Sequence, residues 1–395
     1  DGSGSSWDNA IPELADALEK VADWDAHADG ILQIWVAEGI YMPTKDKNVN
    51  ASFQLANGVE VYGGFPATGN PSIDNRDFFA HRTVLTGDVD GNDTQEIITD
   101  PVNQISGNNS YHVVTGSGTD RTAKLDGFII TAGYARNSSA TYEGGGIYNL
   151  QGSPTLVNLV IIGNRATNGG GIGNNDNSSP LLLNVVVSNN VADYTGGGIY
   201  IFNNSSPELT NVTITENSGA SGGGVYNRYN SSPVITNSVI WNNDEGGNKE
   251  APGASIHNFN VSSDLVATVS YSLVANSGGS GDWSELIGAD GGNNIDNDPL
   301  FSNVGISDYR LRAGSPAIDA GDEDSYSNAG GDLVSDMDLG GSPRYIGETI
   351  DMGAYEYKAP KIFPTDGILF VKKDATGDGS GSSWDNAIPE LADAL

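Results

Sequence analysis

Short apolar runs alternate with turns rich in glycine and asparagine, and this alternation repeats four times between residues 144 and 243. One repeated pattern is Gly-Gly-Gly-Ile/Val-Tyr-Asn, with Gly173 replacing the Tyr in the second copy and Ile201 replacing the Asn in the third. The other is Ser-Pro-x-Leu/Ile-x-Asn, followed by an apolar run and a second Asn. Successive copies lie 25 to 27 residues apart, and a fixed period of this size is typical of a solenoid. The triple glycines begin at Gly144, Gly169, Gly196 and Gly222.

The apolar runs predict β-strands, because they are short, alternate in polarity and are rich in Val, Ile, Leu and Thr. Within the repeats, no run of ten residues shows the 3.6-residue period of a helix. Equivalent residues of successive repeats would stack inside, as in the column Ile147, Ile172, Ile199 and Val225. We therefore predict an all-β parallel β-helix with about 26 residues and three strands per coil, its coils hydrogen-bonded about 4.8 Å apart.

An asparagine stands between two strand segments of every repeat, where the chain must bend sharply. Asn tolerates the left-handed backbone conformation better than most residues, and stacked Asn side chains can hydrogen-bond along the axis. The repeats therefore predict a structural ladder formed by Asn158, Asn184, Asn211 and Asn237.

Composition limits the kinds of partner that the chain can bind. It has 395 residues, no Cys, and 51 acidic against 18 basic side chains, which gives a net charge of −33. This charge disfavours nucleic acid and anionic membranes and favours solubility or cation binding. No apolar run approaches the ~20 residues that span a bilayer.

Residues 1–18 are identical to residues 378–395, which predicts one unit of a tandem array followed by the opening of the next unit. A short helix is expected from Trp7 to Val21, as a lid over the strand edges at the end of the coils. The predicted divisions are an N-terminal cap with this helix (1–30), the β-helix (31–357, with regular coils at 125–245 and looser coils at 250–357), a stiff linker (358–367) and the start of the next unit (368–395).

Several motifs resemble those of a known family: Gly2–Ala10 with its copy Gly379–Ala387, Ile34–Tyr41, Val61–Phe65, Tyr309–Gly321 and Asp351–Tyr357. Together with the repeats, they resemble the secreted bacterial right-handed parallel β-helix repeat proteins of the choice-of-anchor type, whose Gly-Gly-Gly-Ile-Tyr-Asn repeats are like those of the polymorphic outer-membrane adhesins. The resemblance covers nearly the whole chain. It implies a right-handed coil, export, and a location outside the cell or on its surface.

Catalytic chemistry is not evident in the repeats. Parallel β-helices often host polysaccharide lyases and hydrolases, which need clustered carboxylates and, for uronates, a Lys or Arg. Between residues 140 and 245, Lys and His are absent, and no two carboxylates fall at matching positions on the Gly-Gly-Gly strands of neighbouring coils. We therefore predict no catalytic residue and a chain that is not an enzyme. The scattered histidines are expected in turns or on the surface: His27, His81, His112 and His257.

Two further groups of residues are candidates for binding. Alternating oxygen ligands at Asp88, Asp90, Asn92 and Asp93 are typical of Ca²⁺ loops, although the EF-hand glycine and final glutamate are missing, and a solvated acidic turn is favoured. No cofactor is required, and Ca²⁺ is the only candidate. Tyr148, Tyr200 and Tyr226 alternate with the inward column and should point outward, as a strip for stacking on sugars or as a self-stacking ladder, which is favoured.

The leading hypothesis is a structural repeat unit of an extracellular fibre, sheath or surface stalk, whose partners are neighbouring identical units in the same chain or in a homopolymer. The alternative is an adhesin module that binds a glycan. A polysaccharide lyase or hydrolase is the third hypothesis. Nucleic acid binding and membrane insertion are not expected.

Overall fold

The computed structural model describes residues 2–22, 24, 30–69, 71–73, 76–136, 142–259, 266–359 and 370–373. The chain divides into one compact unit, residues 1–357, and a second unit, residues 358–395. Nearly all of the second unit lies outside the described residues, including most of the predicted linker and the repeated segment 378–395.

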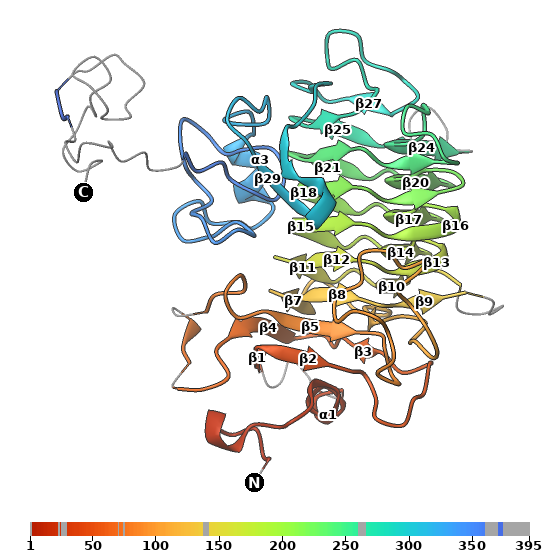
Figure 1. The fold of residues 1–395 in the computed structure, drawn as a ribbon, viewed down its shortest axis with the longest axis vertical. Coiled ribbons are helices and arrows are strands. Elements are labelled where there is room, and N and C mark those ends of the chain that lie inside the picture. Colours follow the sequence, from red (N-terminus) through yellow and green to blue (C-terminus); the bar gives the residue numbers. More distant parts are fainter. Residues whose placement is uncertain are drawn as a thin grey trace. The chain divides into compact units, whose positions relative to one another are not determined.

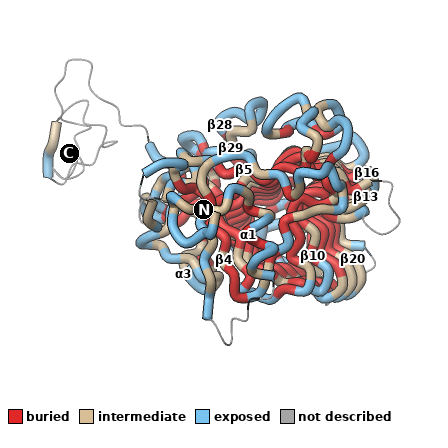
Figure 2. Tube along the Cα trace, turned by 90° about the horizontal axis from the view of Figure 1, so that it is seen from below, coloured by how far each residue is buried: buried red, intermediate tan, exposed pale blue. Residues whose placement is uncertain are grey.

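The first unit is a right-handed-type parallel β-solenoid of about eight turns, which confirms the predicted fold class. Its turns stack from β1 (Leu32–Ala37) to β27 (Ala289–Asp290), as Figure 1 shows. Buried residues, drawn in red, follow the stacked strands through the interior (Figure 2). No helix among the residues that the structure describes is long and apolar enough to cross a membrane.

Two of the three parallel sheets receive one strand from each regular turn. The seven-stranded sheet carries the strands that follow the triple glycines, and the five-stranded sheet carries strands that the sequence did not predict. The seven-stranded sheet contains β3 (Phe53–Gln54), β6 (Val114–Thr115), β10 (Ile147–Leu150), β14 (Ile172–Asn175), β17 (Ile199–Phe202), β20 (Val225–Arg228) and β24 (Ile256–Phe259). The five-stranded sheet contains β9 (Tyr134–Ala135), β13 (Arg165–Asn168), β16 (Val191–Thr195), β19 (Ser218–Gly219) and β23 (Asp244–Glu245).

The third sheet has fifteen strands, because the two strand segments on either side of the ladder asparagine belong to one sheet. In two turns these segments fuse into a single long strand. Besides β1 and β27, the sheet contains β2 (Gly39–Tyr41), β4 (Val59–Phe65), β5 (Thr83–Thr86), β7 (Lys124–Asp126), β8 (Ile129–Thr131), β11 (Thr155–Val157), β12 (Val160–Ile162), β15 (Leu181–Ser188), β18 (Glu208–Thr215), β21 (Val234–Thr236), β22 (Val239–Trp241), β25 (Thr268–Ser270) and β26 (Leu273–Val274).

The repeat period sets the register between turns. Ile147 pairs with Ile172, which pairs with Ile199, and all three side chains are buried in the main core. Columns through Leu156 and Ile161 are continuous in the same way. Each turn thus buries the same aliphatic positions, and this burial specifies the register, because a slip of one residue would turn these side chains outward.

A helix covers the N-terminal end of the coils. The chain forms a 3-10 turn, η1 (Trp7–Asn9), and then the helix α1 (Leu14–Lys20), which is shorter than predicted. Pro12 accounts for the difference, because the residue before a proline is biased away from the helical conformation. Leu14 and Leu18 of α1 are buried in the main core.

The C-terminal part of the first unit differs from the prediction. Looser coils were expected over residues 250–357, but in the structure the coils end near residue 295. Beyond them, a hairpin and loops pack on the outer face of the fifteen-stranded sheet, where Tyr309, Leu339 and Met352 form a second apolar cluster with Val186 and Val239. This segment has no 26-residue period, so its packing could not be predicted. It contains β28 (Phe301–Asn303), η3 (Val304–Ile306), β29 (Asp308–Leu311) and α3 (Glu323–Asn328).

Candidate functional site

The outer face of the seven-stranded sheet carries an aromatic column. In register from turn to turn it consists of Thr115, Tyr148, Gly173, Tyr200, Tyr226 and His257. The rings of Tyr200 and Tyr226 stack with centroids 6.0 Å apart, and Tyr226 stacks on His257 at 5.1 Å. Of the three predicted tyrosines, Tyr200 and Tyr226 therefore stack on each other, whereas Tyr148 stacks on His112.

The tyrosines are less accessible than a surface strip requires. Tyr200 is 3 % exposed and Tyr226 is 4 % exposed, which corrects the expectation of an open strip. The first glycine of each triple folds the preceding segment back over the sheet, so that a Cβ on Gly169 would lie 3.0 Å from the Cβ of Tyr200. Gly169 has a φ of +62°, a conformation that favours glycine.

The column is interrupted at Gly173, and an acidic segment lies over the gap. A Cβ at position 173 would lie 2.8 Å from the Gly144 nitrogen and 3.3 Å from the Glu143 carbonyl carbon. Asn175 Nδ2 donates a short hydrogen bond to the Glu143 carboxylate. The glycine of the second repeat thus leaves room for the segment that carries Glu143.

A groove of about 410 Å³ opens at this interruption. Aromatic rings, two carboxylates, amides and a guanidinium group line it. The lining residues are Tyr142, Glu143, Tyr148, Leu150, Asn168, Asn175, Asp176, Tyr200, Phe202, Arg228 and Tyr229. Of these lining residues, only Tyr148 and Tyr200 were predicted as candidate site residues from the sequence.

Glu143 is the most perturbed acid of the groove. Burial raises its pKa to about 7, and repulsion from Asp176 adds to the rise, while a hydrogen bond with Asn168 acts in the opposite direction. Burial also raises the pKa of Tyr148 to about 12, and both carboxylates contribute to that shift. Glu143 therefore takes up and releases a proton near neutral pH, as a general acid or base must.

Two lining residues of the groove carry a buried polar atom without a hydrogen-bond partner. Asn175 is 7 % exposed, and its Oδ1 atom has no hydrogen-bond partner among the described residues. The Nε atom of Arg228 is also buried without a described partner, although Nη2 donates to the hydroxyl of Tyr229 at 2.6 Å. Buried polar atoms without partners cost free energy, so the wall of the groove is less favourable for stability than a fully hydrogen-bonded coil.

The proposed Ca²⁺ loop is organised mainly by its own backbone. Asp88 accepts hydrogen bonds from the amides of Gly91, Asn92 and Asp93, at 2.8 to 3.2 Å. Burial raises the pKa of Asp93, and repulsion from Asp88 and Asp90 adds to it. Within the described ranges, no three His, Asp or Glu side chains form a group suited to a metal ion. Calcium binding here stays a prediction.

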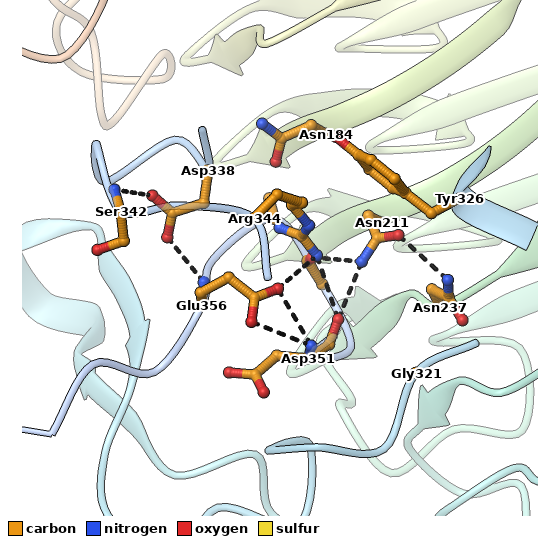
Figure 3. Close-up of polar contacts among 12 residues, drawn as sticks. Asn184, Asn211, Asn237, Gly321, Tyr326, Asp338, Ser342, Arg344, Asp351 and Glu356 are labelled. Carbon is orange, nitrogen blue, oxygen red and sulfur yellow. Dashed lines mark hydrogen bonds and ion pairs between the residues drawn. The ribbon is translucent and has the colours of Figure 1, made fainter. Parts of the chain in front are cut away.

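The predicted asparagine ladder is built as expected in its backbone. Asn158, Asn184, Asn211 and Asn237 all have φ between +51° and +57°. Asn184 donates to Asn158 at 2.6 Å, and Asn237 donates to Asn211 at 3.2 Å. Asn211 instead donates to the carbonyls of Asp351 and Gly353, so part of the column holds the C-terminal segment (Figure 3).

A second asparagine ladder lies at the final Asn of each repeat. Asn164, Asn190 and Asn217 each donate from Nδ2 to the Oδ1 atom of the next asparagine at 3.0 Å, ending at Asn243. All four side chains are buried. The repeat pattern contained this ladder, because the final Asn recurs as regularly as the first, but its role was not predicted.

The C-terminal segment is fastened by a fully buried arginine. Arg344 lies 3.2 Å from Glu356 and donates to the carbonyls of Asp351 and Gly353 at 3.1 and 2.8 Å (Figure 3). Burial raises the pKa of Glu356 to about 8 and that of Asp351 to about 6, with Arg344 acting in the opposite direction on both. No substrate can reach this cluster, because the side chains of Arg344 and Glu356 are fully buried, so we assign it a structural role.

The groove acids were not predicted as site residues because no two carboxylates fall at matching positions on the Gly-Gly-Gly strands of neighbouring coils. Glu143 precedes β10 and Asp176 follows β14, so in the sequence they stand at opposite ends of neighbouring strands. The glycine turn reverses the chain and brings Glu143 over β14. A signal was available: Asn168, Thr195 and Ser221 fill the position of Glu143 in the other turns, so an acid there departs from the repeat.

Comparison with known proteins gives little beyond the fold. No protein-family model matches the chain, and no curated protein matches it. A solved structure, the crystal structure of pectate lyase Pel9A, matches with a TM-score of 0.36 and 14 % sequence identity, over 84 % of this chain and 90 % of that chain. The resemblance to the choice-of-anchor proteins is thus supported only as a parallel β-solenoid.

The same comparison overturns the prediction that the chain is not an enzyme. The structure that it matches over most of its length is an enzyme with a β-helix fold, and we withdraw that prediction. A likeness of this size identifies no substrate and no residue, so what the chain does must be argued from its own groove.

Proposed function

We propose that the groove over β10, β14 and β17 binds a glycan chain. The observation that supports this is its composition, since the accessible rings of Tyr142, Tyr148 and Phe202 lie beside carboxylate, amide and guanidinium groups in one hollow. Aromatic faces pack against the apolar faces of sugar rings, and a few polar groups placed among them fix orientation through the hydroxyls.

The charges of the groove favour a neutral glycan. Glu143 and Asp176 face the ligand, and the net charge of −33 repels an anionic polymer. The amide side chain of Asn168 and the guanidinium group of Arg228 line the groove and can form hydrogen bonds with sugar hydroxyls. Glycan binding was the alternative hypothesis from the sequence.

A glycan array followed by calorimetry on the bound neutral oligosaccharides tests this function. Tyr142 lines the groove and is partly exposed, so Tyr142→Ala removes a ring without emptying the core. It should weaken binding about tenfold, the equivalent of about 1.4 kcal/mol. The matched control is Tyr194→Ala, which removes an exposed ring from the five-stranded sheet and should leave affinity unchanged. Absence of any glycan ligand, or equal affinity in both variants, would contradict the proposal.

A second role, as a structural unit of an extracellular array with neighbouring identical units, is favoured by the identity of residues 1–18 and 378–395. In such an array, the coils of one unit would not continue directly into the coils of the next, because Leu14 and Leu18 of α1 cover the strand edges at one end of the coils. Electron micrographs of the native material test this role: regularly spaced units support it, whereas isolated particles contradict it.

A further inference from the structure

We infer that the free edge of β1 is a docking site for residues 368–373 of a second copy of this chain, which add one more parallel strand to the fifteen-stranded sheet. This inference rests on the second role proposed above, the array of identical units, and names the contact that joins them. It does not depend on glycan binding. Three observations support it: an unpaired strand edge, a segment of matching chemistry, and the repeated cap sequence that follows this segment.

The strand β1 ends one row of the fifteen-stranded sheet at the N-terminal end of the coils (Figure 1). Among the strands that the structure describes, β1 pairs with β4 alone. The Leu32 N–H donates to the Gly58 carbonyl at 2.9 Å, so alternation along the strand turns the N–H groups of Gln33 and Trp35 to the other edge. No residue of β1 is charged. An edge of this kind is a template for an added strand.

The side chains of β1 are partly uncovered, as they are at the open end of a stack. Leu32 and Ile34 are only partly buried, whereas Val59 and Val61, their register partners in the next turn, are each 1 % exposed. Trp35, which alternates with them, is 36 % exposed. One further strand would cover these positions, and the apolar surface removed from water would favour association.

Residues 368–373, with the sequence Ile-Leu-Phe-Val-Lys-Lys, fit this edge. Alternation along a strand gives each face of the segment two apolar side chains followed by a lysine. If the segment runs parallel to β1, as β4 does, its lysines lie beside Glu38, which follows β1 and whose side chain is 39 % exposed. Residues 358–373 carry four of the 18 basic side chains and a single acid, in a chain with a net charge of −33. The charges of the segment and of its docking site are therefore complementary.

The repeated cap sequence allows a neighbour to dock without loss of the cap. Residues 378–395 repeat the N-terminal cap sequence, in which Leu14 and Leu18 anchor α1 in the main core. Leu391 and Leu395 are the equivalents of these two leucines, so the copy from a neighbour can replace the resident cap with the same contacts. Exchange of an identical element between protomers is a low-cost route to assembly, and the added strand is then a net gain.

The direction of the chain agrees with this exchange. In the resident cap, the ring of Trp7 in η1 lies 6.1 Å from that of Phe65, and Phe65 stacks on Trp35 of β1 at 4.9 Å. Phe65 also pairs with Ala37, the last residue of β1. The cap therefore begins beside the end of β1, where a parallel added strand would finish and lead into the copied cap.

Sedimentation of the full chain over a concentration series tests this contact. The wild type should form dimers and longer species, because each chain has one donor segment and one acceptor edge. Gln33→Pro removes an N–H from the free edge and keeps the hydrogen bonds to β4, so it should shift association about tenfold or more to higher concentration. Val371→Pro should do the same from the donor side, and it lies outside the first unit, so the coils stay intact. The matched controls Gln33→Ala and Val371→Thr keep both N–H groups and should associate as the wild type does.

Mixing the two proline variants separates exchange between molecules from a contact within one molecule. Gln33→Pro keeps its donor segment and Val371→Pro keeps its edge, so the mixture should give one-to-one pairs and nothing longer. A monomeric wild type, association that survives in both proline variants, or a mixture without pairs overturns the inference.

The outcomes also separate this contact from the role on which it rests. Regularly spaced units in micrographs, with association unchanged in the proline variants, would overturn the contact and leave the array in place. Isolated particles in the native material, with pairing that depends on Gln33 and Val371, would overturn the array and leave the contact in place.

Discussion

Replacing Arg344 with Met should release the C-terminal segment from the side of the solenoid. Arg344 is the cation that faces three buried carboxyls, those of Asp338, Asp351 and Glu356. It also donates to two backbone carbonyls that Met cannot bond. Met has a similar volume, so the change mainly removes charge and hydrogen bonds.

The free energy of unfolding lost in Arg344→Met depends more on the burial of the charged groups than on the distance between them. At an effective dielectric constant of about 20, the 3.2 Å separation from Glu356 corresponds to an attraction of about 5 kcal/mol when Glu356 is ionised, which its raised pKa of about 8 restricts to alkaline pH. Removing one partner of a buried pair typically costs about 3–5 kcal/mol. The Arg310–Asp308 pair is shorter, at 2.7 Å, but the Arg310 side chain is 56 % exposed, so Arg310→Met should cost about 1 kcal/mol or less.

The penalty should depend on pH in a stated direction. The pKa of Glu356 rises from 4.5 to about 8 in the folded protein, and that of Asp351 from 3.8 to about 6. The folded state then binds protons more tightly than the unfolded state, so this cluster loses stability as pH rises through that range. Arg344 lowers both pKa values, and its removal should therefore cost more at pH 8 than at pH 5.

Denaturant unfolding at the two pH values, with hydrogen exchange of residues 338–357, measures this effect. Exchange should accelerate in the C-terminal segment before the coils, because local opening precedes global unfolding. The double variant Arg344→Met/Glu356→Gln should regain part of the loss, since no charge is then left opposite the missing arginine. Unfolding free energies equal to wild type in Arg344→Met, or a penalty independent of pH, would refute the reasoning.

Three further predictions concern the coils and the acidic loop. Ile199→Asp should destabilise the fold by several kcal/mol in a thermal melt, because an unpaired charge would enter the core, and Tyr200→Ser should cost about 3 kcal/mol, because the ring is buried in the stacked column. Asn217→Ala should cost more than 1 kcal/mol, since it leaves ladder partners unpaired. If residues 88–93 bind Ca²⁺, EDTA should lower the melting temperature, and identical melts with Ca²⁺ and EDTA would exclude that site.

The solenoid could be predicted because its period is explicit in the chain. Equivalent positions such as Leu156 and Leu182 pair across turns, so the sequence period directly gives the register. The docking of the C-terminal segment could not be predicted, because it depends on contacts between residues far apart, such as Asn211 with Gly353. No local pattern announces that Arg344 will be buried, and a lone arginine in a loop ordinarily lies in solvent.

For a related reason, the aromatic residues of the candidate site could be predicted from the sequence and its acidic residues could not. The aromatic column follows from strand alternation, and the sequence placed Tyr148 and Tyr200 on one face correctly. The acids depend on the turn at Gly144, whose reversal of the chain is a property of backbone geometry. Periodicity therefore predicted the wall of the groove and not the groups that would act on a ligand.

Departures from the repeat, more than the repeat itself, support the proposed position of the binding groove. A tyrosine at position 173 would continue the column, and each stacked aromatic pair contributes about 0.5–1.5 kcal/mol beyond its buried area. The protein forgoes that stabilisation at one turn, and the preceding turn covers the gap with Glu143, an acid without a described cation. Two unfavourable choices at one place need a common explanation. A groove that binds a ligand beside a titratable acid provides it, whereas a coil serving only as scaffold would keep the tyrosine and a small polar residue, as the two following turns do with Tyr200 and Thr195 and with Tyr226 and Ser221.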